Sequence, residues 1–219
     1  MPQSILFDID GTLLDSVDLH AEAWAEILQK YGFNVPAAAV RTQIGKGGDE
    51  LLPVFVPEDV LDRDGQRMKD ERAALFKKKY LPQVRPFPKV RELFERLKAD
   101  GKRVALASSG KNDEVDQYKR IAGISDLIDD HTSADDVERS KPHPDIFLAA
   151  LDKLGNPDHK TVVAIGDTPY DAEAAGKAGL KTIGVLCGGF PAEDLQKAGC
   201  VALYRDPADL LANYEAWAR

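Results

Sequence analysis

The chain has 219 residues, of which 43% are hydrophobic and 30% charged, with 17 glycines and 13 prolines. A chain of this length and composition buries enough apolar surface to fold without disulfides, which excludes mini-proteins, disordered chains and collagen-like sequences. Lysine and arginine number 29 against 37 aspartates and glutamates, a formal net charge of -8, so no basic surface for nucleic acid is expected.

The sequence predicts no membrane segment and no disulfide. No run approaches the roughly 20 apolar residues that span a bilayer, and Asp8 and Asp10 interrupt the apolar core that a signal peptide needs. Cys187 and Cys200 are interpreted as buried apolar residues in a reducing compartment, with a redox pair as the alternative. We therefore expect a cytoplasmic protein, either a monomer or a weak dimer, with no membrane partner.

Four short apolar segments, each followed by a small or acidic turn, predict buried strands of one sheet. They are Ser4–Phe7, Arg103–Ala107, 161–165 and 182–186. Helical spacing of apolar residues between these segments, as at 90–97 and 146–154, predicts an alternation of strands and helices. The fold class expected is α/β, with a Rossmann-like, doubly wound parallel sheet whose strand ends carry the ligand site.

One stretch breaks this alternation. Residues 17–80 show helical patterns without a convincing strand, and Ser16 is placed to cap the first of these helices. We predict an α/β core formed by residues 1–15 and 84–219, with residues 16–83 inserted as an α-helical cap domain. Two short connections between these parts suit a hinge over a cleft.

The most informative motif follows the first strand: Asp8, Ile9, Asp10, Gly11 and Thr12. Strand alternation puts Asp8 and Asp10 on roughly the same side, and Gly11 allows a tight turn beyond them. Neighbouring carboxylates repel each other unless a proton or a cation separates them, and Mg²⁺ is the usual cation in a phosphate site. A plain Asp-Gly turn at the end of a strand is the alternative.

A second acidic cluster follows the predicted strand 161–165. Asp167 lies in the turn and Asp171 one helical turn further on, so both side chains can face one cavity. Alternatively, Asp167 or Thr168 caps a helix that has Pro169 at its first position. Capping and metal binding are compatible.

Four converging carboxylates require a positive side chain as well as a metal. Lys141 is the candidate, because Pro142 and Pro144 restrict the loop that carries it. The alternative is a solvated loop lysine.

A third polar turn ends the predicted strand Arg103–Ala107. Ser108, Ser109 and the following glycine offer hydroxyl and backbone N–H donors in front of a helix, which is typical of an anion site. A serine-rich turn without a ligand is the alternative.

Taken together and in this order, the four segments resemble the haloacid dehalogenase superfamily of phosphatases and phosphomutases across the whole chain. The four motifs of that superfamily match Asp8, Asp10, Gly11 and Thr12; Ser108; Lys141; and Gly166, Asp167 and Asp171. The insert resembles the helical cap of its phosphoglycolate phosphatase and β-phosphoglucomutase branch. Because Asp10 is retained, the chain looks like a phosphoryl-transfer member rather than a dehalogenase or a phosphonate-cleaving enzyme.

The resemblance implies a role for each matched residue. Asp8 would attack phosphorus to form an aspartyl phosphate, and Asp10 would act as general acid and then general base. The Asp8 side chain, the Asp10 backbone carbonyl and Asp167 would bind Mg²⁺, while Asp171 would orient the groups around Lys141 and the metal. The phosphate oxygens would be held by Ser108, Ser109, Gly11 and Lys141.

Substrate choice is expected from the cap. His20 resembles a histidine of the β-phosphoglucomutase branch that ties cap closure to the position of Asp10; a surface or half-buried helix histidine is the alternative. Lys46, in a Gly-rich segment, is the candidate cation that enters the cleft. The mutases carry an arginine shortly after the glycine of this loop, where this chain has Gly47, Gly48 and Asp49.

The predicted function is therefore Mg²⁺-dependent hydrolysis of a small phosphate monoester, a sugar or polyol phosphate, through an aspartyl-phosphate intermediate. Two alternatives stay open at this point. One is a phosphomutase similar to β-phosphoglucomutase, and the other is a non-catalytic protein that binds a phosphorylated metabolite.

Overall fold

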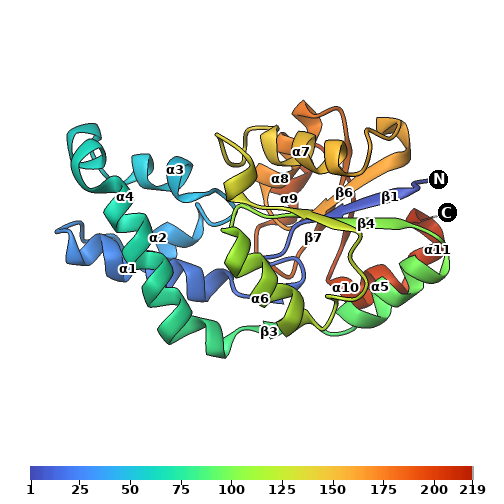
Figure 1. Ribbon diagram of the computed structural model, residues 1–219, viewed down its shortest axis with the longest axis horizontal. Helices are drawn as coiled ribbons and strands as arrows, with labels where there is room; N and C mark the ends of the chain where they lie inside the picture. Colours follow the sequence, from blue (N-terminus) through green and yellow to red (C-terminus); the bar gives the residue numbers. More distant parts are fainter. Residues whose placement is uncertain (219) are drawn as a thin grey trace.

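The computed structural model describes residues 1–218 and shows one twisted sheet between two layers of helices, with a helical insert at one end (Figure 1). The sheet has six strands, all parallel, in the order β5-β4-β1-β6-β7-β8. The strands are β1 (Ser4–Phe7), β4 (Arg103–Ala107), β5 (Asp130–Thr132), β6 (Val162–Gly166), β7 (Lys181–Val185) and β8 (Cys200–Tyr204). The predicted doubly wound α/β core is confirmed.

Two strands were not predicted from the sequence. β5 is three residues long and reads Asp-His-Thr, so it lacks the apolar run that marks a strand covered on both faces. β8 reads Cys-Val-Ala-Leu-Tyr, an apolar run that lies at the sheet edge and is not fully buried. Their place in the sheet comes from pairing with β4 and β7, which are buried strands.

The order of the strands reverses at β1. Phe7 at the end of β1 pairs with Leu106 of β4 on one side and with Ile165 of β6 on the other. The chain therefore leaves β1 toward one edge of the sheet and later returns to build the other half from β6 outward. In doubly wound sheets, ligands bind at this switch point, beyond the carboxyl ends of the strands.

Alternate side chains of the strands enter two cores. In β1, Ile5 and Phe7 face one core and Leu6 the other. The first face is covered by α5 (Val90–Ala99), α6 (Asn112–Ala122), α10 (Pro207–Ala212) and α11 (Tyr214–Trp217). The second is covered by α7 (Asp145–Lys153) and α8 (Pro169–Lys177), with α9 (Ala192–Lys197) against α8 and β8. Short 3-10 turns, η4 (Ala134–Asp136) and η5 (His159–Thr161), complete this part.

The insert is helical throughout and has a core of its own. Its elements are α1 (Val17–Lys30), α2 (Ala37–Arg41), α3 (Gly48–Leu51), η1 (Leu52–Val54), α4 (Glu58–Leu75), the π-helical turn η2 (Phe76–Tyr80) and η3 (Leu81–Gln83). Trp24, Ile27 and Leu28 of α1 pack with Val40 and Met68 in this third core. These residues of α1 thus lie on the face that the helix buries.

The two connections between the insert and the sheet lie side by side. β2 (Leu14–Asp15) and β3 (Arg85–Pro86) form a two-stranded antiparallel ladder, and Phe87 N–H donates to Leu13 O at 2.9 Å just beyond it. Ser16 precedes α1 as its N-cap residue, but its hydroxyl donates to Asp10 Oδ1 at 2.6 Å instead of bonding to a helix amide. Ser16 is thus the predicted N-cap residue by position, but its side chain does not make the capping hydrogen bond.

Both cysteines are free and only partly buried. Cys187 donates its thiol to the Gly11 carbonyl at 3.2 Å, and Cys200 begins the edge strand β8. The prediction that both are fully buried is therefore wrong, because each lies at a margin of the fold. Among residues 1–218, no helix combines the length and the apolar character that crossing a membrane requires.

The core under α5 gives a stability prediction. Phe94 is fully buried and its ring lies 4.8 Å from that of Phe7. Replacing Phe94 by alanine leaves a cavity under β1 and is expected to lower the free energy of unfolding by about 3–5 kcal/mol. Urea denaturation followed by circular dichroism measures this loss. Leu148→Ala, at a side chain that is 45% exposed, is the control and is expected to change it by less than about 0.5 kcal/mol.

Candidate active site

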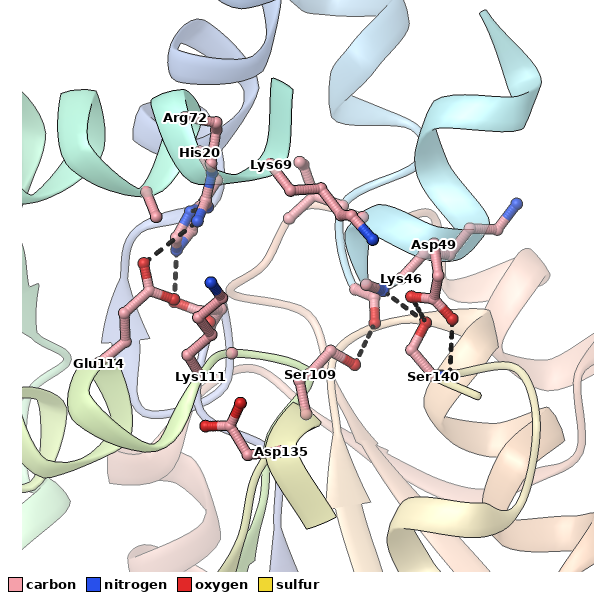
Figure 2. A pocket seen from close by; sticks show the side chains of 18 of the residues that line it. His20, Lys46, Asp49, Lys69, Arg72, Ser109, Lys111, Glu114, Asp135 and Ser140 are labelled. Atoms are coloured by element: carbon pink, nitrogen blue, oxygen red, sulfur yellow. Dashed lines mark hydrogen bonds and ion pairs between the residues drawn. The ribbon is translucent and has the colours of Figure 1, made fainter. Parts of the chain in front are cut away.

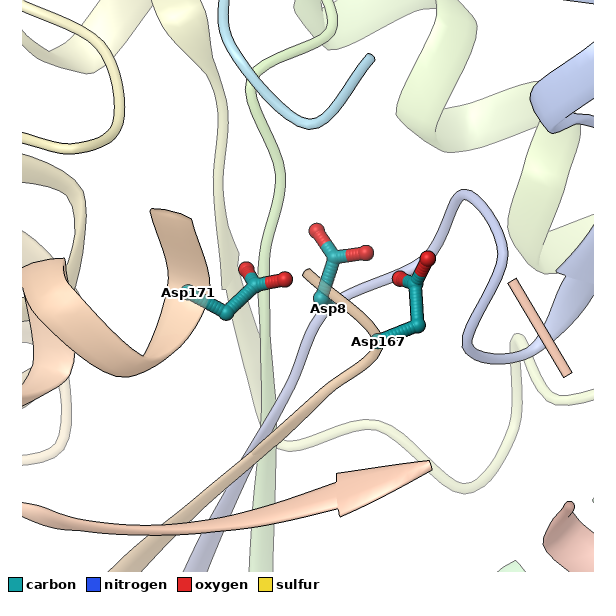
Figure 3. A group of neighbouring side chains, drawn as sticks. All are labelled: Asp8, Asp167 and Asp171. Atoms are coloured by element: carbon teal, nitrogen blue, oxygen red, sulfur yellow. The ribbon is translucent and has the colours of Figure 1, made fainter. Parts of the chain in front are cut away.

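Three aspartates meet at the switch point of the sheet. Asp8 follows β1, Asp167 follows β6, and Asp171 lies in the first turn of α8. Figure 3 shows Asp8 between Asp171 and Asp167, and one carboxylate oxygen from each lies within 4.8 Å of those of the other two. All three residues are buried. Residues 163 positions apart in the chain therefore share one acidic cluster because β1 and β6 are neighbours.

Lys141 supplies the positive charge of this cluster. It is fully buried, and its ammonium donates to Asp8 Oδ1 at 2.5 Å and to the Ala107 carbonyl at 2.8 Å, and lies 2.7 Å from Asp171 Oδ1. Burial alone would lower the pKa of Lys141, but the carboxylates of Asp171 and Asp8 outweigh it and raise that pKa above its usual value. The alternative of a solvated loop lysine is wrong. A permanent cation stands beside Asp8.

The Asp8 carboxylate has one oxygen committed and one nearly free. Oδ1 is bound by Lys141, whereas Oδ2 receives only a long contact of 3.4 Å from the Thr12 hydroxyl. Burial raises the pKa of Asp8 to about 7; Lys141 opposes this, and the negative charges of Asp171 and Asp10 add to it. Oδ2 is thus a buried carboxylate oxygen that is available to bind a cation or to attack an electrophile.

Asp167 is the least satisfied acid of the cluster. Its Oδ1 accepts from the Thr12 hydroxyl at 2.9 Å, but its buried Oδ2 has no hydrogen-bond partner within residues 1–218. Burial, followed by the charges of Asp8 and Asp171, raises the pKa of Asp167 well above its ordinary value. The backbones of Gly11 and Gly188 pack so closely on this carboxylate that a Cβ at either position would overlap it.

Asp171 has both oxygens engaged. Oδ1 lies on Lys141, while Oδ2 accepts from Thr168 N–H at 3.1 Å and from its hydroxyl at 2.7 Å. Thr168 in turn accepts from Asp171 N–H, so the pair forms a capping box at the start of α8. Of the two caps considered from the sequence, Thr168 is the one observed. The capping box holds the Asp171 side chain in place, and the Asp171 carboxylate in turn holds the Lys141 ammonium.

These donors fit a hard divalent cation. Asp8 Oδ2 and Asp167 Oδ2 are buried carboxylate oxygens without a strong partner, and oxygen ligands of this kind suit Mg²⁺. Two raised carboxyl pKa values next to each other indicate a site in which negative charge lacks compensation. Asp171 fits less well as a ligand because its oxygens already bind Lys141 and Thr168.

Asp10 sits in a different environment. Its Oδ1 accepts from the Ser16 hydroxyl at 2.6 Å and lies 2.8 Å from Nε2 of His20. Burial favours the neutral acid, but the charge and hydrogen bond of His20, the hydrogen bond of Ser16 and the charge of Arg72 together lower the pKa of Asp10. Asp8 and Asp10 are therefore two residues apart in sequence, with pKa values shifted in opposite directions.

His20 is buried rather than on the surface. Its ring stacks on Phe76 with centroids 4.0 Å apart, and Arg72 of α4 contacts its Nδ1. Nδ1 of His20 faces Arg72 and Nε2 faces Asp10, so the ring lies between these two side chains. The alternative of a surface or half-buried histidine is wrong. Through His20 and Arg72, α1 and α4 of the insert both lower the pKa of Asp10.

A cavity of about 400 Å³ opens above this cluster, between the insert and the core. Asp8, Asp10 and Ser109 line it from the core, and Trp24 and Arg72 from the insert. Figure 2 shows that charged side chains from both parts surround it.

Direct hydrogen bonds close the cavity on one side. Ser140, the residue before Lys141, accepts from Gly47 N–H at 2.9 Å, and its own N–H and hydroxyl donate to the two Asp49 oxygens at 3.0 and 2.7 Å. Ser109 donates its hydroxyl to the Gly45 carbonyl at 3.2 Å. The Gly-rich segment of the insert is thus anchored to the loop that carries the buried lysine.

The remaining residues predicted for the site lie as follows. Ser108 is buried, with its hydroxyl accepting from Gly110 N–H at 3.0 Å, and Ser109 reaches the insert. Gly11 N–H donates to the Leu14 carbonyl at 2.8 Å, and a role of Gly11 in phosphate binding stays a prediction. Lys46 lines the cavity, but its ammonium donates to Gln43 at 2.7 Å and lies over the Tyr170 ring.

Several cavity residues were missed from the sequence: Lys69, Arg72, Lys111, Glu114 and Asp135. Lys69 and Arg72 belong to α4, Lys111 and Glu114 to the start of α6 and the residue before it, and Asp135 to η4; no local motif marks them. A charged residue on a helix is usually solvated, so only the packing of α4 against the core distinguishes these from their neighbours.

A doubly wound core with a helical insert and an acid cluster around a buried lysine defines a Rossmann-like hydrolase with a capping insert. The chain belongs to the haloacid dehalogenase-like hydrolase family, whose model matches residues 5–185. The prediction that the chain belongs to this superfamily is confirmed. The prediction that it is a hydrolase acting on phosphate esters is confirmed as well.

Similar proteins of known name cover nearly the whole chain. A phosphorylated carbohydrates phosphatase of Thermotoga maritima is 29% identical over 95% of this chain and 96% of its own length. A phosphoglycolate phosphatase of Aquifex aeolicus is 30% identical over 84% of each. A crystal structure of a hydrolase from Pseudomonas syringae superposes with a TM-score of 0.91 at 31% identity, covering 99% of this chain and 100% of that one.

Asp167 Oδ2, which has no hydrogen-bond partner within residues 1–218, leads to a testable effect on the stability of the protein. In EDTA at pH 7.5, Asp167→Asn is expected to be more stable than the unmodified protein by about 1–3 kcal/mol, the cost of a buried group without a partner. The sign of this effect follows from the raised pKa of Asp167 in the folded protein. Below the ordinary value of 3.8 the carboxyl group is protonated in both the folded and the unfolded state, and the unmodified protein loses stability as the pH rises above that value.

Urea denaturation at pH 4 and pH 7.5 measures this difference, which should shrink at pH 4. Asp62→Asn, at an exposed residue of α4, is the control and should leave stability unchanged at both pH values. A destabilised Asp167→Asn protein at pH 7.5 would contradict the account of an uncompensated charge.

Proposed function

We propose that the protein is a Mg²⁺-dependent phosphatase that hydrolyses a small phosphate monoester, a sugar or polyol phosphate, through an aspartyl phosphate on Asp8. The observation that carries this proposal is the 2.5 Å contact between Asp8 Oδ1 and the buried Lys141 ammonium, which leaves Oδ2 available. A nucleophilic carboxylate needs this arrangement, because its reaction brings two negative groups together.

In the first step, Asp8 Oδ2 forms a bond to phosphorus as the bond from phosphorus to the ester oxygen breaks. Asp10 protonates the leaving alkoxide, which departs as a neutral alcohol. Ser16 and His20 hold Asp10 at the mouth of the cavity, where it lines the space that the leaving group would occupy. General acid catalysis of this kind contributes on the order of 10²- to 10⁴-fold.

In the second step, Asp10 is a carboxylate and accepts a proton from water. The water oxygen bonds to phosphorus while the bond from phosphorus to Asp8 breaks, which releases phosphate and regenerates both aspartates. The lowered pKa of Asp10 favours the carboxylate form that this step uses, whereas the first step starts from its protonated form. Lys141 remains beside Asp8 and balances the charge on the phosphoryl oxygens in both steps.

Asp167 Oδ2, the Asp10 backbone carbonyl and the Asp8 carboxylate oxygen that is not bonded to phosphorus are the groups that would hold Mg²⁺. When bound, the ion would neutralise charge on the phosphate and on the two carboxylates. Asp171 would keep Lys141 in place, and Ser108 and Ser109 would offer hydroxyls to phosphate oxygens from the end of β4. Residues 16–83 would act as the cap, hinged at β2 and β3.

Hydrolysis is favoured over phosphate transfer between two positions of one sugar. Gly47 and Gly48 stand where a mutase has its arginine, and the Lys46 ammonium is already bound by Gln43. The names of similar proteins support the same choice, since they include a phosphorylated carbohydrates phosphatase and a fructose-1-phosphate phosphatase. A cytoplasmic location and a monomeric or weakly dimeric state stay predictions.

The proposal is tested with p-nitrophenyl phosphate as an artificial substrate. The unmodified protein is expected to release phosphate with Mg²⁺ and to lose this activity in EDTA. Asp8→Asn should abolish turnover because the nucleophile is gone, and Asp10→Asn should lower kcat about 10²- to 10⁴-fold. Asp194→Asn, at an exposed site on α9, is the control.

Two outcomes decide between the alternatives. Full turnover by Asp8→Asn, or no Mg²⁺-dependent turnover by a folded unmodified protein, would falsify the proposal and favour a binding protein. With glucose 1-phosphate as substrate, phosphate release supports a phosphatase, whereas accumulation of glucose 6-phosphate indicates a mutase.

A further inference from the structure

Asp49 of the insert places both of its carboxylate oxygens on a single residue of the core. Ser140 donates its N–H to Asp49 Oδ2 at 3.0 Å and its hydroxyl to Asp49 Oδ1 at 2.7 Å (Figure 2). Asp49 is an exposed residue in the first turn of α3, whereas Ser140 is buried. An exposed carboxylate is usually solvated. Here two charge-assisted hydrogen bonds hold it on a buried residue instead.

The backbone of the insert approaches Ser140 equally closely. Gly47 N–H donates to the Ser140 hydroxyl at 2.9 Å. A Cβ at Gly47 would lie 2.7 Å from both Cβ and Oγ of Ser140, which is closer than real side chains come, so the contact requires a glycine there. The Ser140 carbonyl accepts from His143 N–H at 2.9 Å. The insert therefore holds Ser140 at its N–H and its hydroxyl, while its carbonyl closes a turn within its own loop.

Ser140 immediately precedes Lys141, so the insert fixes the backbone from which the buried lysine extends. At the other end of this side chain, the ammonium donates to Asp8 Oδ1 and lies 2.7 Å from Asp171 Oδ1. During phosphate transfer the ammonium also has to balance charge on the phosphate oxygens, so its contact with Asp8 alone no longer sets its position. An anchor on the backbone side keeps the ammonium in place, and this matters because small displacements of a positioning group reduce reaction rates steeply.

We propose that Asp49 is a positioning residue for Lys141. By binding Ser140 it holds the loop of the lysine, and through that loop the ammonium, where phosphate transfer at Asp8 requires it. Asp49 lines the cavity, but Ser140 engages both of its oxygens, so Asp49 acts through this residue and not by touching the substrate. The proposal rests on the proposed function in that Lys141 is taken to balance the charge of the phosphate.

Binding of inorganic phosphate tests this role without turnover. Calorimetry with Mg²⁺ measures the Kd of phosphate for the unmodified protein and for Asp49→Ala. The variant is expected to bind phosphate about tenfold more weakly, in line with the loss of one hydrogen bond to a charged group. Asp49→Asn retains one acceptor oxygen and should fall between the two. Because Asp49 is exposed, both variants should fold, which circular dichroism checks.

A kinetic test separates a displaced lysine from a displaced Asp10. It compares p-nitrophenyl phosphate, whose leaving group departs without a proton, with phenyl phosphate, whose leaving group needs one; kcat/KM reports the steps up to the aspartyl phosphate. Asp49→Ala is expected to lower kcat/KM about 10- to 100-fold for both substrates alike, because both need the ammonium of Lys141. An insert that merely misplaced Asp10 would lower the value more for phenyl phosphate.

A double-mutant cycle assigns the effect to the contact with Ser140. Ser140→Ala removes the hydroxyl and keeps the backbone N–H, so it should reproduce part of the loss in kcat/KM. If Asp49 acts through Ser140, the loss in the protein that carries both substitutions is smaller than the product of the two single losses. If Asp49 acted on the substrate directly, the two losses would multiply.

Two control variants weaken other contacts between the insert and the core and leave Ser140 untouched. Glu50→Gln, at the next residue of α3, weakens the contact with His143 at 3.3 Å. Tyr170→Phe removes the hydrogen bond from the Tyr170 hydroxyl to the Thr42 carbonyl at 2.6 Å. Both variants should leave the Kd of phosphate and kcat/KM unchanged.

The outcomes separate the two proposals. An unchanged Kd of phosphate in Asp49→Ala, a larger loss for phenyl phosphate than for the nitrophenyl ester, or losses that multiply in the cycle would overturn the role of Asp49. Equal losses in the control variants would do the same, since they would indicate general loosening of the insert. Failure of the proposed function appears separately, as absence of Mg²⁺-dependent aryl phosphate turnover in the unmodified protein, and the Kd of phosphate still decides the role of Asp49 in that case.

Discussion

The site depends on how three buried carboxylates are kept together around one buried ammonium. Asp8, Asp167 and Asp171 are buried and repel one another, and Lys141 balances only part of their charge. The cluster persists because each member is fixed by its backbone: two follow central strands and the third is locked in a helix cap. The fold thus holds in place a concentration of negative charge that the side chains alone would disperse.

The same constraint explains the division of labour between the aspartates. Asp171 is fully engaged by Thr168 and Lys141, whereas Asp167 keeps one bare oxygen. Asp8 shares both conditions, with one oxygen on Lys141 and the other almost free. A metal cation is needed next to carboxylate oxygens that lack a hydrogen-bond partner, and not next to those that already have one. Hydrogen bonding therefore distinguishes the aspartates that would bind metal from the one that orients its neighbours.

The insert matters because it completes the environment of residues that belong to the core. His20 and Arg72 lie in α1 and α4, yet they lower the pKa of Asp10, and Asp49 binds the residue next to Lys141. The environment of the aspartates therefore depends on the packing of the insert on the core, and the cavity between them has walls from both parts.

The sequence by itself determined the central strands, the turns that end them and the residues of the acidic cluster. Apolar runs that end in Asp8, Ser108 and Asp167 are local patterns, and parallel strands have to bring such turns to one edge. Local patterns also identified Lys141 by its prolines. They failed for β5, whose three polar residues form a strand by pairing with β4, whereas β8 carries an apolar run that was not singled out.

Only the tertiary structure decided which cations reach the cavity. Lys46 looked free in the sequence and is bound by Gln43, whereas Lys69 looked like any solvated helix lysine and has no partner among the described residues. It also showed that Gly11 gives its amide to Leu14 and that Ser16 serves Asp10 instead of α1. The physical reason is that a hydrogen-bond partner distant in sequence leaves no trace in local composition or spacing, so it becomes visible only when packing brings the two groups together.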